Sequence, residues 1–373
     1  MTNLLDRLDR TPGSSQLHRW ADWAELICFA SDDGRITVPE LSSRIRERRD
    51  QLPDEAHDDQ EPTDTTTDPL IFALEVSEEE LRELESADDL EEDLGTDSQD
   101  SLAREKFEAA VKNRADDILK YLAARQARYK EAYPFLVDLG SRTVELRDQT
   151  ESRDVYLFLL ICSSFLYLSE KRSEGEFAFA FEVLSTAALK NYLPTDSEVH
   201  LFGTNPYHGS GRYEGLLFDK VKLLAGDLNL RLLADRKDFH PNDRGDHGLD
   251  IAAWLPLGDK LAATPVLLAQ CACTREWVTK QHSSTANQWR PLISFAVDPV
   301  SVCLIPFDFR DLDGGWYYKT DIHGTVLLDR QRLIHLLLDV GSDYANPRVV
   351  GQLDDLGLRG LVSGGRAADL VTQ

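Results

Sequence analysis

The sequence predicts an α/β domain in the C-terminal part of the chain, preceded by α-helical N-terminal and middle regions. Before residue 200, apolar residues recur mainly at helical spacing. From Gly209 onward, short apolar runs alternate with helical stretches in the order α-β-β-β-α-β, with additions. Because 373 residues exceed the usual size of one domain, we expect two or three folding units.

The N-terminal and middle regions differ in composition. Residues 1–50 are expected to form a small helical module, residues 51–100 an acidic and partly disordered linker, and residues 101–200 a helical region. Helices are predicted at Leu17–Ala30, Pro39–Arg49, Ser101–Ala132, Asp154–Glu170 and Glu176–Tyr192. The acidic run could mimic DNA for a partner, although a solvated linker is the more common role of such a segment.

The α/β domain is expected over residues 201–345, with a C-terminal tail at 346–373. Its predicted elements are a helix at 213–228, strands at 230–233, 249–255 and 266–271, a helix from Thr274, a strand at 300–307 and a strand-helix pair at 325–340.

The formal net charge of −25 opposes nucleic-acid binding at low salt, because phosphate contacts need positive charge. Asp outnumbers Glu and Arg outnumbers Lys, a composition that resembles proteins of salt-loving (halophilic) microbes. At about 1 M salt the Debye length is only about 3 Å, so global repulsion largely vanishes. Residues 53–100 hold 20 acids and one base, but residues 212–285 hold ten of each. The second segment is therefore locally neutral.

The chain has neither a membrane span nor a signal peptide by its pattern. No apolar run reaches the roughly 18 residues that a span needs, and the N-terminus lacks basic and apolar signal regions. We therefore expect a cytoplasmic protein without a membrane partner. The five cysteines are scattered, which argues against a disulfide framework. Cys271 and Cys273 lack a matching second pair, so a buried strand end is favoured over a thiol metal site.

Asp250 and Gln270 lie on two adjacent predicted strands and are the strongest candidates for chemistry. An Asp among apolar strand residues is costly to bury unless it is paired or binds a metal, and Gly248 leaves room for a ligand. Two oxygen ligands on neighbouring strands suit a hard cation such as Mg²⁺ (or Mn²⁺). Such a cation can activate water for phosphodiester hydrolysis. The alternatives are that Asp250 accepts backbone hydrogen bonds and that Gln270 is a satisfied buried amide.

Four segments taken in order resemble the core of the PD-(D/E)XK superfamily of restriction-endonuclease-like nucleases, especially the type IV restriction and defence-associated kind. They are Tyr213-Glu214, Gly245-Asp246-His-Gly248, Leu249-Asp250-Ile251 and Gln270-Cys271. That kind typically reads Gly-x-Asp-Gly-x-Asp-(Ile/Leu), then Gln-x-Lys, with Phe/Tyr-Glu at the start of the first core helix. The resemblance covers residues 210–340 and implies a restriction-endonuclease-like αβββαβ core.

The resemblance implies a role for each matching residue. Asp250 would be the principal metal ligand, and Gln270 the second ligand or the group that orients the attacking water. Glu214 would complete the metal shell from the first core helix, with Glu182 in Phe181-Glu182 as its rival. Asp246 would shape the turn or add a further carboxylate.

The chain departs from the family pattern at Ala272, where the lysine is expected. Members of the superfamily sometimes supply this cation from the following helix, which here starts at Thr274. Lys280 is the candidate for the migrated catalytic lysine, with Arg275 as the second candidate. Trp277 lies one turn from Lys280, can face the same way and is a possible accessory residue. The alternative, that Lys280 is an ordinary surface residue, stays open.

Two functions follow as expectations. The first is a Mg²⁺-dependent DNA endonuclease that acts as a prokaryotic antiviral or restriction defence effector. The second is a catalytically inactive nuclease-fold protein that serves as a binding or assembly module in a defence complex. The expected partners are DNA, proteins of the same defence operon and a second copy of the chain in a homodimer. His240 and His247 are expected to be exposed, whereas Arg330 and Arg332 could contact phosphate.

Overall fold

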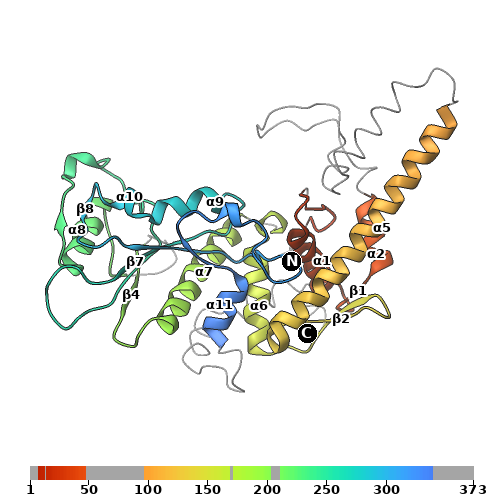
Figure 1. Ribbon diagram of the computed structural model, residues 1–373, viewed down its shortest axis with the longest axis horizontal. Helices are drawn as coiled ribbons and strands as arrows, with labels where there is room; N and C mark the ends of the chain where they lie inside the picture. Colours follow the sequence, from red (N-terminus) through yellow and green to blue (C-terminus); the bar gives the residue numbers. More distant parts are fainter. Residues whose placement is uncertain (1–6, 13, 48–95, 169–170, 203–210, 339–373) are drawn as a thin grey trace. The chain divides into compact units, whose positions relative to one another are not determined.

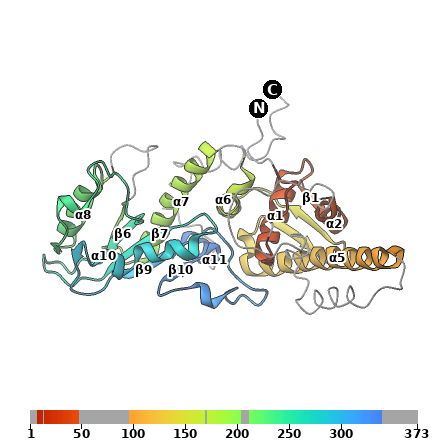
Figure 2. The ribbon, with the colours of Figure 1, turned by 90° about the horizontal axis from the view of Figure 1, so that it is seen from above.

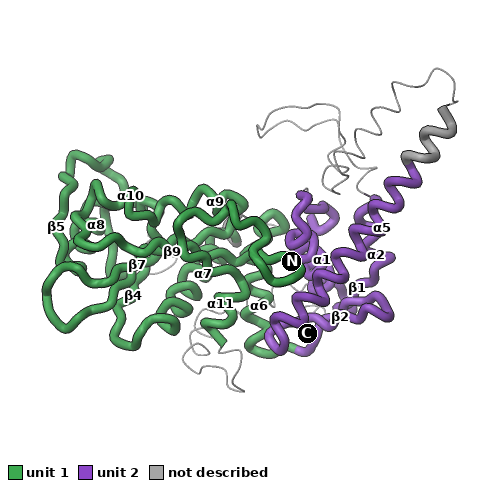
Figure 3. The backbone as a smooth tube through the Cα atoms, viewed as in Figure 1, with its two compact units in different colours: residues 1–4, 149–365 green, residues 5–148, 366–373 purple. Residues whose placement is uncertain are grey.

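The computed structural model describes residues 7–12, 14–47, 96–168, 171–202 and 211–338. They form two compact units that divide between Asp148 and Gln149 (Figure 3). The predicted boundaries at residues 100 and 200 differ from this division, because the first middle helix belongs to the N-terminal unit and the other two belong to the C-terminal unit. The predicted linker up to residue 95 and the predicted tail at 346–373 lie outside the described residues.

The N-terminal unit combines helices with a small antiparallel sheet (Figure 1). The helices α1 (Leu17–Ala30), α2 (Val38–Glu47) and α5 (Thr96–Tyr129) confirm those predicted from apolar spacing. Three strands pair in the order β1-β3-β2: β1 (Arg35–Thr37), β2 (Phe135–Asp138) and β3 (Thr143–Leu146). The prediction of a purely helical region is wrong here, because strands of three or four residues are too short to show a two-residue period.

A buried ion-pair cluster joins α1 to α5 in this unit. Arg125 is fully buried, and its guanidinium lies 2.7 Å from Asp22 and 2.8 Å from Glu25. Tyr133 donates a hydrogen bond of 2.7 Å to the other carboxylate oxygen of Glu25. A buried charge without a partner is strongly destabilising. Because these side chains pair with one another, we assign them a structural role in packing α1 on α5.

A mixed five-stranded sheet forms the centre of the C-terminal unit, in the order β10-β9-β7-β6-β4. β6 runs antiparallel to both of its neighbours, whereas β7, β9 and β10 run parallel. The strands are β4 (Glu198–Leu201), β6 (Ile251–Trp254), β7 (Val266–Cys271), β9 (Val300–Leu304) and β10 (Val326–Leu328). The carboxyl ends of β7, β9 and β10 therefore meet the amino end of β6 at one edge of the sheet.

Helices cover both faces of this sheet (Figures 1 and 2). On one face, α7 packs on β4 and β7 and also contacts α6 and α11. On the other face, η5 packs on β7 and β9 beside α9 and α10, and α8 shares a core with Ala252, Leu268 and Trp289. The bounds are α6 (Glu151–Cys162), α7 (Lys171–Tyr192), α8 (Leu217–Asp227), α9 (Trp277–Lys280), η5 (Gln281–Ser284), α10 (Ala286–Trp289) and α11 (Arg330–Leu338).

The C-terminal unit is mixed α/β, as the sequence predicts, but the first helix and first strand predicted for its α/β domain differ from those observed. The helix predicted from Tyr213 begins at Leu217. The strand predicted after it is reduced to β5 (Arg231–Leu232), which pairs with β8 (Ile293–Ser294) outside the main sheet. The first strand of the main sheet is instead β4, which the sequence analysis missed because it is short and half polar. Among the described helices, none is both long and apolar enough to cross a membrane.

Candidate functional site

The edge of the sheet where β7 ends and β6 begins brings Asp250 and Gln270 into contact. Asp250 is only 6% exposed and directly precedes β6. Its Oδ2 accepts hydrogen bonds of 2.6 Å from the Gln270 side-chain amide and 2.6 Å from the Cys271 backbone N–H. No described residue donates a hydrogen bond to Oδ1. One oxygen of this carboxylate is therefore fixed by the protein, and the other is left for a ligand.

The amide of Gln270 is held from both ends. Its Nε2 faces Asp250 and also donates to the Cys271 carbonyl at 3.0 Å, while its Oε1 accepts a 2.8 Å hydrogen bond from Ser283 on η5. In this arrangement the Gln270 amide nitrogen orients the Asp250 carboxylate, and the Gln270 Oε1 is bonded to Ser283. To act as a metal ligand, the amide would have to rotate and exchange these two partners.

Gly248 is needed for this packing. Its φ is +72°, and a Cβ at this position would lie 2.4 Å from the Cβ of Ser283 and 3.5 Å from the Gln270 Oε1. Ser283 Oγ also lies 2.6 Å from the Gly248 carbonyl. The expectation from the sequence was that Gly248 leaves room for a ligand, whereas here the space is filled by Ser283.

Glu182 on α7 completes an acidic cluster with Asp250 and Asp246. Desolvation, together with the charges of Asp250 and Asp246, raises the pKa of Glu182 to about 9. Desolvation is also the main cause that raises the pKa of Asp250, to about 7, and the Asp246 charge adds to it. No described residue forms a hydrogen bond or ion pair with the Glu182 carboxyl group. In the described part of the chain, no cationic side chain is therefore paired directly with Glu182.

Asp246 shapes the turn before Asp250, as expected. Its Oδ1 accepts a 2.7 Å hydrogen bond from the Gly248 N–H. Lys220, which the sequence analysis missed, holds the same turn: its fully buried ammonium donates to the carbonyls of Arg244 at 3.0 Å and Gly245 at 2.8 Å. Desolvation lowers the pKa of Lys220, against the opposite effect of the Asp246 charge. The available signal was weak, because α8 holds two lysines, Lys220 and Lys222, among its apolar residues, and only Lys220 is buried.

Lys280 lies within electrostatic reach of the site, since its charge lowers the pKa of Asp250. Its ammonium donates a 3.2 Å hydrogen bond to Thr274, which in turn donates to Glu276 at 2.6 Å. Arg275 is exposed on the same segment. Ala272 is fully buried, so no cation occupies the usual lysine position.

Trp277 has a structural role instead of the accessory role suggested by its spacing from Lys280. It is buried in an apolar cluster, with its ring centroid 5.0 Å from that of Phe309. The reason is that the helix from Thr274 forms only one turn, α9, and that turn directs Trp277 into the core.

Glu214 does not lie where the family pattern would place it. It is exposed and precedes α8 instead of standing at the start of a helix, because the backbone around Gly215 is not helical. Its neighbours Arg212 and Tyr213 both bind Asp227, at 2.7 and 2.8 Å. Among the described residues, no contact links Glu214 to Asp250. The rival, Glu182, is the acid that interacts electrostatically with Asp250, since desolvation and then the charge of Asp250 raise the pKa of Glu182.

The remaining candidates have different surroundings. His240 and His247 are exposed, as expected. Arg330 is fully buried, where it donates to the Pro306 carbonyl at 2.8 Å and to Ser163 at 2.8 Å. It therefore cannot contact phosphate, because its position at the start of α11 directs it into the core. Arg332 is exposed.

The donor set of the acidic cluster fits a hard divalent cation. Carboxylate oxygens are the preferred ligands of Mg²⁺, and Mg²⁺ commonly uses only one or two of them together with water. Glu182 and Asp250 would hold the cation, and its charge would favour their ionised forms against the desolvation that is the main cause of both raised pKa values. No group of three or more His, Cys, Asp or Glu side chains in the described part of the chain is arranged as a ready-made metal cage.

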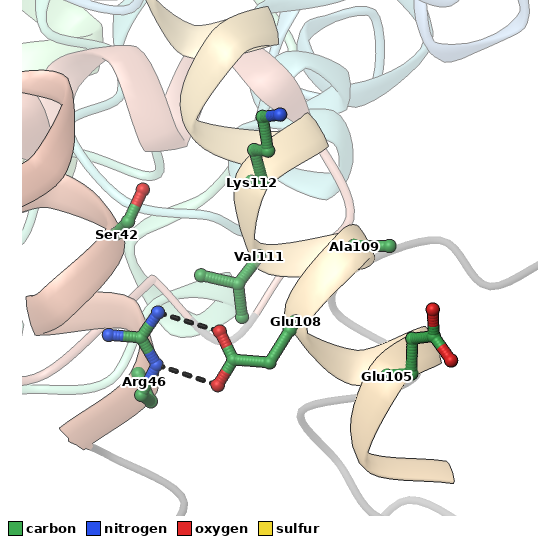
Figure 4. A pocket seen from close by; sticks show the side chains of 7 residues that line it. All are labelled: Ser42, Arg46, Glu105, Glu108, Ala109, Val111 and Lys112. Carbon is green, nitrogen blue, oxygen red and sulfur yellow. Dashed lines mark hydrogen bonds and ion pairs between the residues drawn. The ribbon is translucent and has the colours of Figure 1, made fainter. Parts of the chain in front are cut away.

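A shallow pocket between α2 and α5 belongs to the N-terminal unit (Figure 4). At its wall, Arg46 donates to both oxygens of Glu108, at 2.8 and 2.7 Å. These two charges satisfy each other, so the pocket gives no indication of a ligand.

Comparisons of the chain with models of protein families, with curated proteins and with solved structures found no match.

Proposed function

We propose that the chain is a Mg²⁺-dependent endonuclease that hydrolyses phosphodiester bonds in DNA. The observation that carries the proposal is the contact between Asp250, directly before β6, and Gln270 on β7, within electrostatic reach of Glu182 on α7. The chain order α7-β4-β6-β7-α9/α10-β9, with β6 antiparallel to its neighbours and β9 parallel to β7, supports a restriction-endonuclease-like αβββαβ core. In this version of the core, α7 replaces α8 as the first helix, and Glu182 replaces Glu214.

Each residue has a distinct task in this proposal. Asp250 and Glu182 bind the cation, while Gln270 and the Cys271 N–H fix the Asp250 carboxylate in one orientation. Lys280 would stabilise the charge that develops on the phosphate after releasing Thr274. When bound, the cation supplies Lewis-acid activation of the attacking water and of the phosphate.

Cleavage of a DNA substrate in concentrated KCl with Mg²⁺ tests the proposal. We expect the wild-type chain to cleave, and expect Asp250→Asn and Glu182→Gln to lower the rate at least about 100-fold, since each removes a charge that acts on the transition state. Glu214→Gln is the matched control, because it neutralises an exposed acid of the same unit and should keep full activity. Equal background cleavage by all four proteins would refute activity of the chain alone.

A second candidate function is a catalytically inactive binding or assembly module, and Ala272 favours it. With no lysine on β7 and with Lys280 bonded to Thr274, the site has a place for a cation but no cation side chain in contact with Asp250. This candidate predicts Mg²⁺ binding without cleavage, including in the presence of protein partners. A role in antiviral or restriction defence rests on the family resemblance and is part of the proposal.

A further inference from the structure

A tryptophan and two arginines form a cationic surface beyond the ends of β9 and β10. The guanidinium carbon of Arg310 lies 4.2 Å from the centroid of the Trp316 ring, and that of Arg332 lies 4.8 Å from it. At these distances both cations are attracted by the ring. The ring itself packs on the apolar cluster that includes Trp277 and Ala272. The three side chains are therefore held by the same core that supports the end of β7.

The two arginines differ in what neutralises them. Arg310 is paired with the buried carboxylate of Asp329, at 2.6 and 3.1 Å, and also donates to the Gly314 carbonyl at 3.0 Å. Arg332 is exposed and donates to the Leu327 carbonyl at 2.8 Å. In the described part of the chain, no carboxylate pairs with the Arg332 guanidinium. Arg332 is thus a fixed and uncompensated positive charge on a chain of net charge −25.

This charge lies at the same edge of the sheet as Asp250. Arg332 lies in the first turn of α11, which is separated from the end of β10 by one residue, and β10 runs parallel to β9 and β7. Asp250 directly precedes β6, and β10 is three strands away from β6, which corresponds to about 14 Å at the usual strand spacing. Phosphates follow one another at about 3.4 Å of axial rise per strand of DNA. A strand that crosses this edge from Asp250 would therefore bring a phosphate about four nucleotides away to Arg332.

We propose that Arg332, held over Trp316, binds a backbone phosphate of the nucleic-acid strand whose scissile phosphate lies at Asp250. The proposal rests on the proposed function and adds to it a binding site outside the cleavage centre. Arg332 is preorganised for this contact, because the ring and the Leu327 carbonyl fix its guanidinium before the ligand arrives. Arg310 is not part of the phosphate contact, since Asp329 already neutralises it; it supports the ring.

The salt dependence of DNA binding tests the inference. A fluorescent 30-base-pair duplex is titrated with the full chain carrying Asp250→Asn, which prevents cleavage, over a series of KCl concentrations. Adding Arg332→Ala should reduce the slope of log Kobs against log[KCl] by about 0.9, the value expected for one lost phosphate contact. Adding Arg290→Ala instead is the matched control, because it removes the same charge from an exposed arginine that is paired with Asp298 at 2.5 and 2.6 Å.

The outcomes separate this inference from the proposed function. A reduced slope for Arg332→Ala and an unchanged slope for Arg290→Ala would support the phosphate contact. Equal slopes for both variants, in a chain that cleaves DNA when Asp250 is intact, would overturn the inference and leave the proposed function standing. Failure of the wild-type chain to bind or cleave DNA would overturn both. Since Arg332 is exposed, circular dichroism should show that Arg332→Ala is folded.

Discussion

At the scale of single residues, the site holds two carboxyl groups, Asp250 and Glu182, in surroundings where burial disfavours their charged forms. Asp250 is nearly inaccessible, yet two N–H donors hold one of its oxygens at 2.6 Å. Hydrogen bonds to a carboxylate favour its charged form, whereas desolvation and nearby acids oppose it. Desolvation is the larger effect, so the pKa values of Asp250 and Glu182 are both raised. An arrangement of this kind is costly unless a cation is bound.

The raised pKa of Glu182 predicts how stability changes with pH in the metal-free chain. An unfolded Glu loses its proton near pH 4.3, whereas the folded protein keeps it up to about pH 9. The stabilisation is therefore complete below about pH 4 and is lost progressively as the pH rises from about 4.3 to about 9. In EDTA, Glu182→Gln should match the wild-type Tm at about pH 4 and exceed it at pH 9. A difference of about 1 kcal/mol in the free energy of unfolding would shift Tm by about 2–4 °C in a unit of this size.

Glu214→Gln is the control for this prediction, because the exposed Glu214 should change Tm at neither pH. Calorimetric scans at both pH values measure the effect. A Tm of Glu182→Gln below that of wild type at pH 9 would show that ionised Glu182 has a stabilising partner.

Gly248 allows a second prediction at this scale. Gly248→Ala places a Cβ 2.4 Å from the Cβ of Ser283 in a backbone with φ +72°. Gly258→Ala is the matched control, with φ +82° and no atom within 4 Å of the added Cβ. The control should lose about 1 kcal/mol from strain alone, and Gly248→Ala should lose more and also lose cleavage. Equal losses in urea denaturation would mean that Ser283 moves away freely.

At the scale of secondary-structure elements, the sequence predicted the inner strands β6 and β7 but not the edge strand β4. Val266–Cys271 was predicted with its observed bounds, and β6 lies within the predicted strand, because each is a continuous apolar run flanked by polar turns. β4 was missed, and the helix predicted from Tyr213 begins only at Leu217. Periodicity cannot reveal which helix packs on which strand, since that depends on tertiary contacts. In the proposed function, the second-ranked candidate Glu182 takes the place of Glu214.

The one-turn helix α9 determines whether Lys280 can replace the missing lysine. We expect Lys280→Ala to lower kcat by about 10²-fold or more with little change in KM, because its cation would act mainly on the developing charge. Arg275→Ala, on the same exposed segment, should leave kcat within a few-fold of wild type. Full activity of Lys280→Ala would remove Lys280 from the mechanism, and a larger loss in Arg275→Ala would assign the role to Arg275.

At the scale of the whole molecule, the large negative net charge of the chain does not extend to the segment that carries most of the site. The site lies in the C-terminal unit, whose residues 212–285 hold equal numbers of acids and bases. The sequence predicted a mixed α/β C-terminal part and the contact between Asp250 and Gln270. It did not predict that the long helix α5 belongs with the N-terminal strands, because composition reports the polarity of a segment and not its packing partner.

Glu182 and Asp250 are proposed to form a divalent-cation site, and calorimetric titration of the full chain with Mg²⁺ measures this binding. We expect binding by the wild type and by Glu214→Gln. We expect at least about tenfold weaker binding, equivalent to about 1.4 kcal/mol, for both Glu182→Gln and Asp250→Asn. Wild-type binding that Glu182→Gln leaves unchanged, or no binding by the wild type, would show that these two carboxylates do not form the site.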